Sequence, residues 1–156
     1  MTLVDRLAVL EQQPLVRALA TSEWAYPIVS AGHLLGIALL IGGIAAVDLR
    51  LIGVWRHGLD PVMLVRLRRI AAIGLVLALA TGVALFNVRG SEYIENPWLL
   101  RKWAFVAAGV VNALAFAVWS RSAATALDGP RARATGAISM GCWLGALVCG
   151  RWIAFA

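Results

Sequence analysis

The chain has 156 residues, of which 62% are hydrophobic and 14% are charged, and its formal net charge is +6. A typical soluble domain carries ~25% charged residues, so this composition excludes an ordinary water-soluble domain. The positive charge does not indicate nucleic-acid binding, because most arginines stand at the ends of long apolar segments, where they mark membrane topology.

The first segment, residues 2–21, is predicted to be a short amphipathic helix. Leucines recur at helical spacing, and charged and amide side chains stand between them. Pro14 is expected to divide this helix into two pieces, because proline lacks the backbone N–H that a continuous helix needs. A segment of this kind lies in the membrane interface or caps a bundle.

Four long apolar segments follow, and we interpret them as transmembrane helices. A helix needs about 20 apolar residues to cross a hydrocarbon core of ~30 Å. The alternating ten-residue pattern of a membrane barrel is not found, so the predicted class is all-α: an integral membrane four-helix bundle with an N-terminal interfacial helix. Residues 1–156 are expected to form a single transmembrane domain. Its spans are predicted at about 26–48, 67–87, 98–119 and 135–155.

Charge distribution predicts how these spans are oriented. The connections between spans one and two and between spans three and four hold more than half of the chain's 14 lysines and arginines. The positive-inside rule then places both connections in the cytoplasm and both termini on the opposite side.

Glycine pairs at GxxxG spacing occur in two spans. Gly32 and Gly36 form one pair in the first span, and Gly141 and Gly145 form another in the fourth. Small residues at this spacing allow helices to approach closely. The pattern fits packing within the bundle, and it also fits contact with a protein partner or a second copy of the chain.

The most informative polar residue is His33, which lies inside the first apolar span. An ionisable group at membrane depth is costly and therefore indicates a functional site. Depths derived from ~1.5 Å per residue place Lys102, Arg151 and Cys149 in the same outer layer as His33. Each has a simpler interpretation, because basic side chains also extend to headgroups, and histidine and cysteine also serve packing alone.

Three kinds of ligand fit this layer. A b-type haem would use His33 as an axial ligand, with Lys102 and Arg151 near its propionates. His57 cannot complete that site, since it follows 24 residues later, ~36 Å along a helix. A soft metal such as copper would use His33 and Cys149, although the nearby basic residues disfavour a cation. A quinone or other anionic small molecule would use the basic residues themselves.

Other polar residues within the spans suggest structural roles or secondary contacts. Asn112 is a candidate cofactor contact, but an interhelical hydrogen bond is the favoured interpretation. Asp48 and Arg50 end the first span and are expected to form ion pairs with neighbouring helices. No nucleophile elbow, zinc motif or phosphate loop is present, so no catalytic residue is assigned, and catalysis by this chain alone is not expected.

An ordered set of motifs resembles a bacterial family of small four-helix membrane proteins without an established activity. The residues that carry the resemblance are Trp24-x-Tyr26-Pro27, His33-Leu34-Leu35-Gly36, Asp48-Leu49-Arg50, Thr81-Gly82, Phe86, Asn96-Pro97, Lys102, Asn112 and Gly150-Arg151. A looser similarity is to the membrane domain of copper-resistance protein D, although a convincing copper-ligand set is missing. The resemblance implies a protein of the bacterial inner membrane. In that membrane, the positive-inside rule places both termini in the periplasm.

The sequence thus predicts a small non-enzymatic subunit that packs within a larger membrane assembly. A redox link, through haem b or a quinone at the outer layer, is one form of this hypothesis, and a subunit without cofactor is another. The alternative is a small transporter or binder of copper or of an anionic molecule that uses His33.

Overall fold

The structure is a computed structural model that describes residues 3–55, 59–120, 127–153 and 155. Within this part of the chain all regular structure is helical. The two N-terminal helices are α1 (Leu3–Glu11) and α2 (Pro14–Thr21), and the break between them falls at the predicted place before Pro14. The remaining helices are α3 (Ala25–Ile52), α4 (Pro61–Val88), α5 (Gly90–Tyr93), α6 (Pro97–Ser120) and α7 (Pro130–Trp152).

Four helices are long and apolar enough to cross a membrane, namely α3, α4, α6 and α7. The shortest of them, α7, has 23 residues, which gives a length of ~35 Å against a hydrocarbon core of ~30 Å. Large apolar side chains are exposed along all four, which is expected where helices face lipid rather than water. The chain is therefore a multi-pass membrane protein of the all-α class, as predicted.

Local sequence signals set the helix ends. Asp60 caps α4, where its Oδ1 accepts a hydrogen bond from the Met63 backbone N–H at 2.6 Å, and Pro61 occupies the first turn. Gly53 ends α3 in the left-handed region with φ 98°, a conformation that glycine adopts without a Cβ clash. Asn96 and Pro97 begin α6, because the Asn96 side chain accepts from the Trp98 N–H at 2.9 Å.

The closest packing in the molecule joins α3 to α4. A Cβ atom on Gly36 would lie 2.6 Å from the Ala78 nitrogen, and one on Gly74 would lie 2.5 Å from the Leu40 nitrogen. Gly43 faces Ala71 at a similarly short distance. The small residues on both helices thus let the two backbones touch directly, the arrangement that GxxxG spacing favours.

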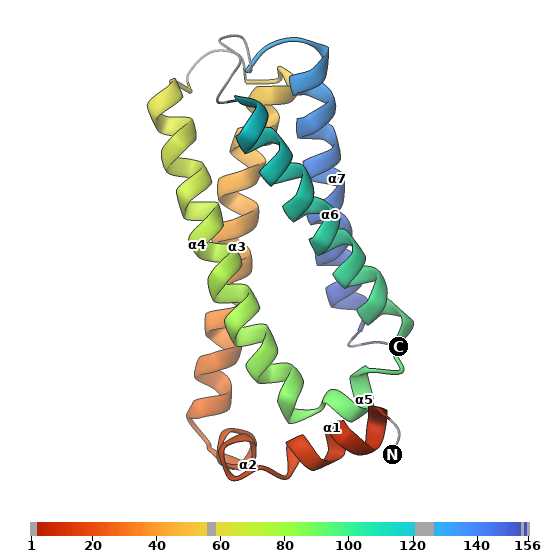
Figure 1. The fold of residues 1–156 in the computed structure, drawn as a ribbon. Coiled ribbons are helices and arrows are strands. Elements are labelled where there is room, and N and C mark those ends of the chain that lie inside the picture. Colours follow the sequence, from red (N-terminus) through yellow and green to blue (C-terminus); the bar gives the residue numbers. More distant parts are fainter. Residues whose placement is uncertain (1–2, 56–58, 121–126, 154, 156) are drawn as a thin grey trace.

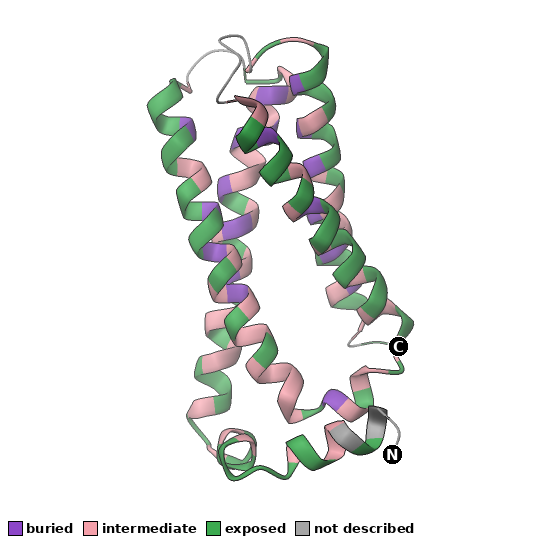
Figure 2. Cartoon of the chain, viewed as in Figure 1, coloured by how far each residue is buried: buried purple, intermediate pink, exposed green. Residues whose placement is uncertain are grey.

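The helices pack in the order α4, α3, α7, α6. Extensive contacts join α3 to α4, α6 to α7 and α3 to α7, while α4 and α6 make almost no backbone contact within the described residues. Figure 1 shows these two helices diverging towards the end that carries both chain termini. We call this the terminal end, and the opposite one, with the α3–α4 and α6–α7 connections, the loop end. Buried residues gather on the facing sides of the helices towards the loop end (Figure 2).

The short helices α1, α2 and α5 lie across the terminal end of the bundle (Figure 1). A hydrogen bond fixes α1 to α5, because Glu11 Oε1 accepts from the Ser91 backbone N–H at 2.7 Å. This N–H belongs to the first turn of α5, where helical N–H groups lack intrahelical acceptors. The amphipathic segment therefore caps the bundle at this end.

The GxxxG glycines divide into packed and open positions. Gly32 and Gly36 face α4. Gly145 faces the Phe105 ring of α6, where a Cβ atom on the glycine would lie 2.8 Å from Phe105 Cε1. Gly141 has nothing within 4 Å of that position. Three of the four glycines therefore serve packing within the chain, the first of the two interpretations that the spacing allowed.

Candidate functional site

His33 lies on α3 and faces α4. Its Nδ1 is 2.9 Å from the Ala78 carbonyl oxygen and 3.2 Å from Thr81 Oγ1. Gly82 leaves room for the imidazole, since a Cβ atom there would come within 3.0 Å of His33 Cε1. The ring therefore lies in a fitted place between two spans rather than on the lipid surface.

These partners assign the ring proton. A carbonyl oxygen only accepts, so Nδ1 must donate to Ala78. The Thr81 hydroxyl donates its own proton to the Leu77 carbonyl at 2.6 Å, which leaves its oxygen free to accept from the same Nδ1–H. In the neutral imidazole, Nε2 then carries an unused lone pair. A histidine held through Nδ1 by a backbone carbonyl, with Nε2 free, has the orientation usual for a metal or haem ligand.

Lys102 extends from α6 across α7 towards this region. A Cβ atom on Gly150 would lie 3.6 Å from Lys102 Cε, so the missing side chain makes space for the lysine stem. The Lys102 charge acts electrostatically on His33. Lys102 is partly buried, yet among the described residues no hydrogen bond or ion pair reaches its ammonium group. An unpaired cation at this depth is costly and would gain from an anionic partner.

The other predicted site residues lie elsewhere. Arg151 is exposed, and its guanidinium stacks 4.5 Å over the Phe155 ring, so it extends away from the bundle interior. Cys149 is buried on α7, beside the glycine that accommodates Lys102. Asn112 uses its amide to join α6 to α7, donating to the Thr135 carbonyl at 3.1 Å. Of the predicted outer layer, Lys102 acts on His33 electrostatically without a direct contact among the described residues, and Arg151 stacks on Phe155 instead.

A metal site built from several acidic, sulfur or imidazole ligands is not found in the described part of the chain, where no three His, Cys, Asp or Glu side chains gather. His57 lies outside the described residues. A metal at His33 would therefore need ligands from another molecule.

A second polar cluster, at the loop end, was not anticipated from the sequence as a unit. Asp48 is only 2% exposed and shares a side-chain hydrogen bond with Ser139 of α7. Arg68 of α4 interacts with its charge, and the Arg68 guanidinium lies 4.5 Å over the Phe116 ring of α6. The four helices are thus tied together by polar contacts at this level.

The expected ion pairing is found for Arg50, which pairs with Asp128 of the α6–α7 connection at 3.1 Å. Among the described residues Asp48 forms no ion pair, although the Arg68 charge acts on it electrostatically. Asp48 Oδ2 and Arg68 Nη2 are both buried without a hydrogen-bond partner among the described residues.

Comparison with protein-family models, with curated proteins and with solved structures finds no match to this chain. The function must therefore be argued from the geometry of these residues alone.

Proposed function

We propose that this chain is a small non-enzymatic subunit of a larger membrane assembly, and that His33 and Lys102 contact a redox-linked ligand there, Lys102 through an anionic group of that ligand. The observation that carries the proposal is the Lys102 ammonium group, which is partly buried, acts on His33 and has no acceptor among the described residues. A carboxylate, such as a haem propionate, would supply that acceptor.

The geometry of His33 supports haem b as the form of this ligand. Its Nδ1–H is directed to the Ala78 carbonyl, so Nε2 is the nitrogen that remains free for iron. The described residues offer no second histidine, so the opposite axial position would be open or would be filled by a partner subunit. This need for an external ligand agrees with a role inside an assembly.

The outer surface of the bundle supports contact with other helices. Gly42 on α3 and Gly141 on α7 are both exposed, and no atom lies within 4 Å of their ideal Cβ positions. Exposed glycines let a neighbouring helix approach the backbone closely, which is how transmembrane helices associate. The partner contact that the sequence suggested at Gly141 is therefore kept in the proposal.

Copurification and absorption spectroscopy test the ligand. The wild-type chain, extracted gently from its native membrane, is expected to show a Soret band or another bound chromophore. Lys102→Met should weaken retention of the ligand, and His33→Ala should abolish a haem spectrum. Arg101→Met is the matched control, because Arg101 is the exposed neighbour of Lys102 and stacks on Trp98. A colourless wild-type protein would exclude haem.

The proposed location is the bacterial inner membrane with periplasmic termini, on the basis of the charge rule and of the family resemblance. Both termini lie at the same end of the bundle, as four crossings require (Figure 1). A reporter enzyme that is active only in the periplasm, fused to the C-terminus, should be active. A cytoplasmic reporter fused at the same place should be inactive.

A further inference from the structure

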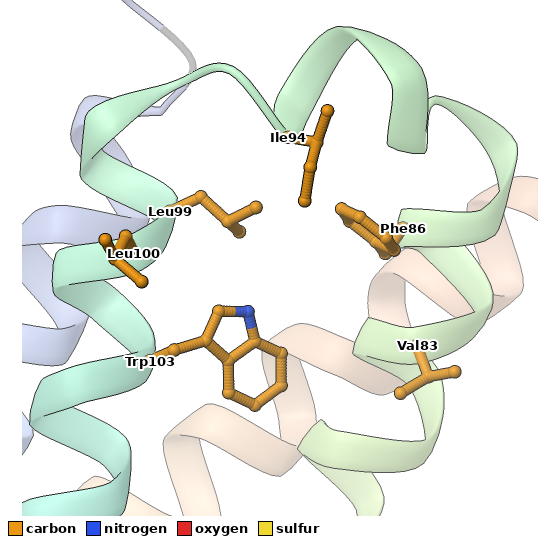
Figure 3. A pocket seen from close by; sticks show the side chains of 6 residues that line it. All are labelled: Val83, Phe86, Ile94, Leu99, Leu100 and Trp103. Atoms are coloured by element: carbon orange, nitrogen blue, oxygen red, sulfur yellow. The ribbon is translucent and has the colours of Figure 1, made fainter. Parts of the chain in front are cut away.

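A cavity of about 370 Å³ lies at the terminal end between α4, α5 and α6, apart from His33 and Lys102. This volume falls in the usual range of ligand pockets, ~300–1,000 Å³. Figure 3 shows its lining, which comes from both diverging helices and from the residue that follows α5. The lining residues are Val83, Phe86, Ile94, Leu99, Leu100 and Trp103.

One polar group enters this apolar lining. The indole nitrogen of Trp103 points into the cavity, towards the space between Leu99 and Phe86 (Figure 3). No hydrogen bond to this nitrogen is found within the described residues. Trp103 is 43% exposed, so its N–H does not require a ligand, but an indole N–H only donates, and a molecule in the cavity can bond to it only by offering an acceptor.

The lining also limits the charge of that molecule. None of the six lining residues carries a charge. A carboxylate held there would lose its hydration without gaining a cation, which is costly. The acceptor is therefore a neutral oxygen, most simply a carbonyl.

The shape and the opening of the cavity point to a flat molecule that arrives from the bilayer. Figure 3 shows the Phe86 ring edge-on and the Trp103 indole face-on, so Trp103 turns its nitrogen edge towards the space beside Phe86. A planar ring would therefore stack on Phe86 and meet the edge of Trp103. The cavity is only half enclosed, and Val83 and Leu100 are 51% and 76% exposed on faces that contact lipid. Because α4 and α6 scarcely touch, an apolar tail can extend between them into the membrane.

We infer that this cavity binds a membrane-dissolved quinone, whose ring stacks on Phe86 and whose carbonyl oxygen accepts a hydrogen bond from Trp103 Nε1. The site uses residues other than His33 and Lys102 and goes beyond the function proposed above. It also gives the subunit a lipid-soluble redox partner.

Calorimetric titration of the chain in lipid nanodiscs with a decyl-substituted benzoquinone tests this inference, with empty nanodiscs as the blank. The wild type should bind the quinone in excess of the blank. Trp103→Phe keeps an aromatic ring but removes the donor, and it should weaken binding about fivefold, the value of one neutral hydrogen bond. Val83→Phe fills the cavity and should weaken binding further.

Two controls make the result specific. Trp98→Phe changes a tryptophan on the same helix that packs against Trp152 outside the cavity, and it should bind as the wild type does. Lys102→Met should also retain quinone binding, which separates this site from the one proposed above. Decylbenzene, which lacks oxygen, should bind more weakly than the quinone. Equal binding of both compounds with no effect of Trp103→Phe would indicate an acyl-chain site and overturn the inference, as would the absence of binding.

Discussion

The crossing of α3 and α4 at Gly36 predicts a strong difference between two glycine positions on one helix. A Cβ atom on Gly36 would lie 2.6 Å from the Ala78 nitrogen, although carbon contacts are normally about 3.5–4.0 Å. The α4 backbone must therefore withdraw by about 1 Å. Overpacking of this kind costs about 1–3 kcal/mol. Gly42, one residue before Gly43 on the same helix, has nothing within 4 Å of its ideal Cβ.

Alanine is a better helix former than glycine by about 1 kcal/mol, and both substitutions gain this amount. Gly42→Ala should therefore be neutral or stabilising, and Gly36→Ala should be less stable than Gly42→Ala by about 1–3 kcal/mol. The assay is reversible unfolding in mixed micelles of increasing SDS fraction, followed by circular dichroism. If Gly36→Ala is as stable as Gly42→Ala, the direct contact between the two backbones is refuted.

Three further predictions concern the polar contacts. Asp48→Leu and Arg68→Met should each destabilise the bundle by about 1 kcal/mol, because each removes one of two charges that attract each other, and the double variant should lose less than the sum of the two single losses. Additive losses in SDS unfolding would contradict this attraction. Asn112→Leu should cost about 0.5–1.5 kcal/mol in the same assay, and no loss would contradict its interhelical bond. Glu11→Ala should speed amide hydrogen exchange of α1 and of Ser91 while the spans stay protected; unchanged exchange would contradict that contact.

The number and position of the spans were predictable, because an apolar run of about 20 residues has few alternatives in a membrane. At the loop end the helices continue past the apolar spans, since α3 runs to Ile52 and α4 begins at Pro61. Charged residues there are compatible with a helix but not with the hydrocarbon core. The apolar runs therefore indicate the membrane spans, and proline and glycine indicate the helix ends.

Depth along a helix was also predictable, whereas side-chain direction was not. The ~1.5 Å rise placed His33 and Lys102 at a comparable level, and the Lys102 charge acts electrostatically on His33. The same rule placed Arg151 with them, but its position around α7 directs it outwards onto Phe155. Rotation about a helix axis depends on which face packs against the neighbours, and one mostly apolar sequence does not specify that face.

The burial of Asp48 on α3 shows which sequence signal could have predicted the packed face of this helix. The buried positions of α3 include Gly36, Gly43 and Val47, which follow heptad-like spacing, and Asp48 lies at the edge of this stripe. The spacing of small residues along α3 therefore marks the face that packs against α4. The cavity beside Trp103 has no such signal, because it arises from the divergence of two helices that are far apart in sequence.

Native mass spectrometry of the chain released from its own membrane in nanodiscs tests for the assembly and the ligand together, because one spectrum reports both partner subunits and bound small molecules. We expect the wild type to carry a partner chain and a non-lipid ligand, and we expect Lys102→Met to lose the ligand while Arg101→Met keeps it. A wild-type chain that is always a bare monomer, with a spectrum identical to that of Lys102→Met, would refute the proposed function.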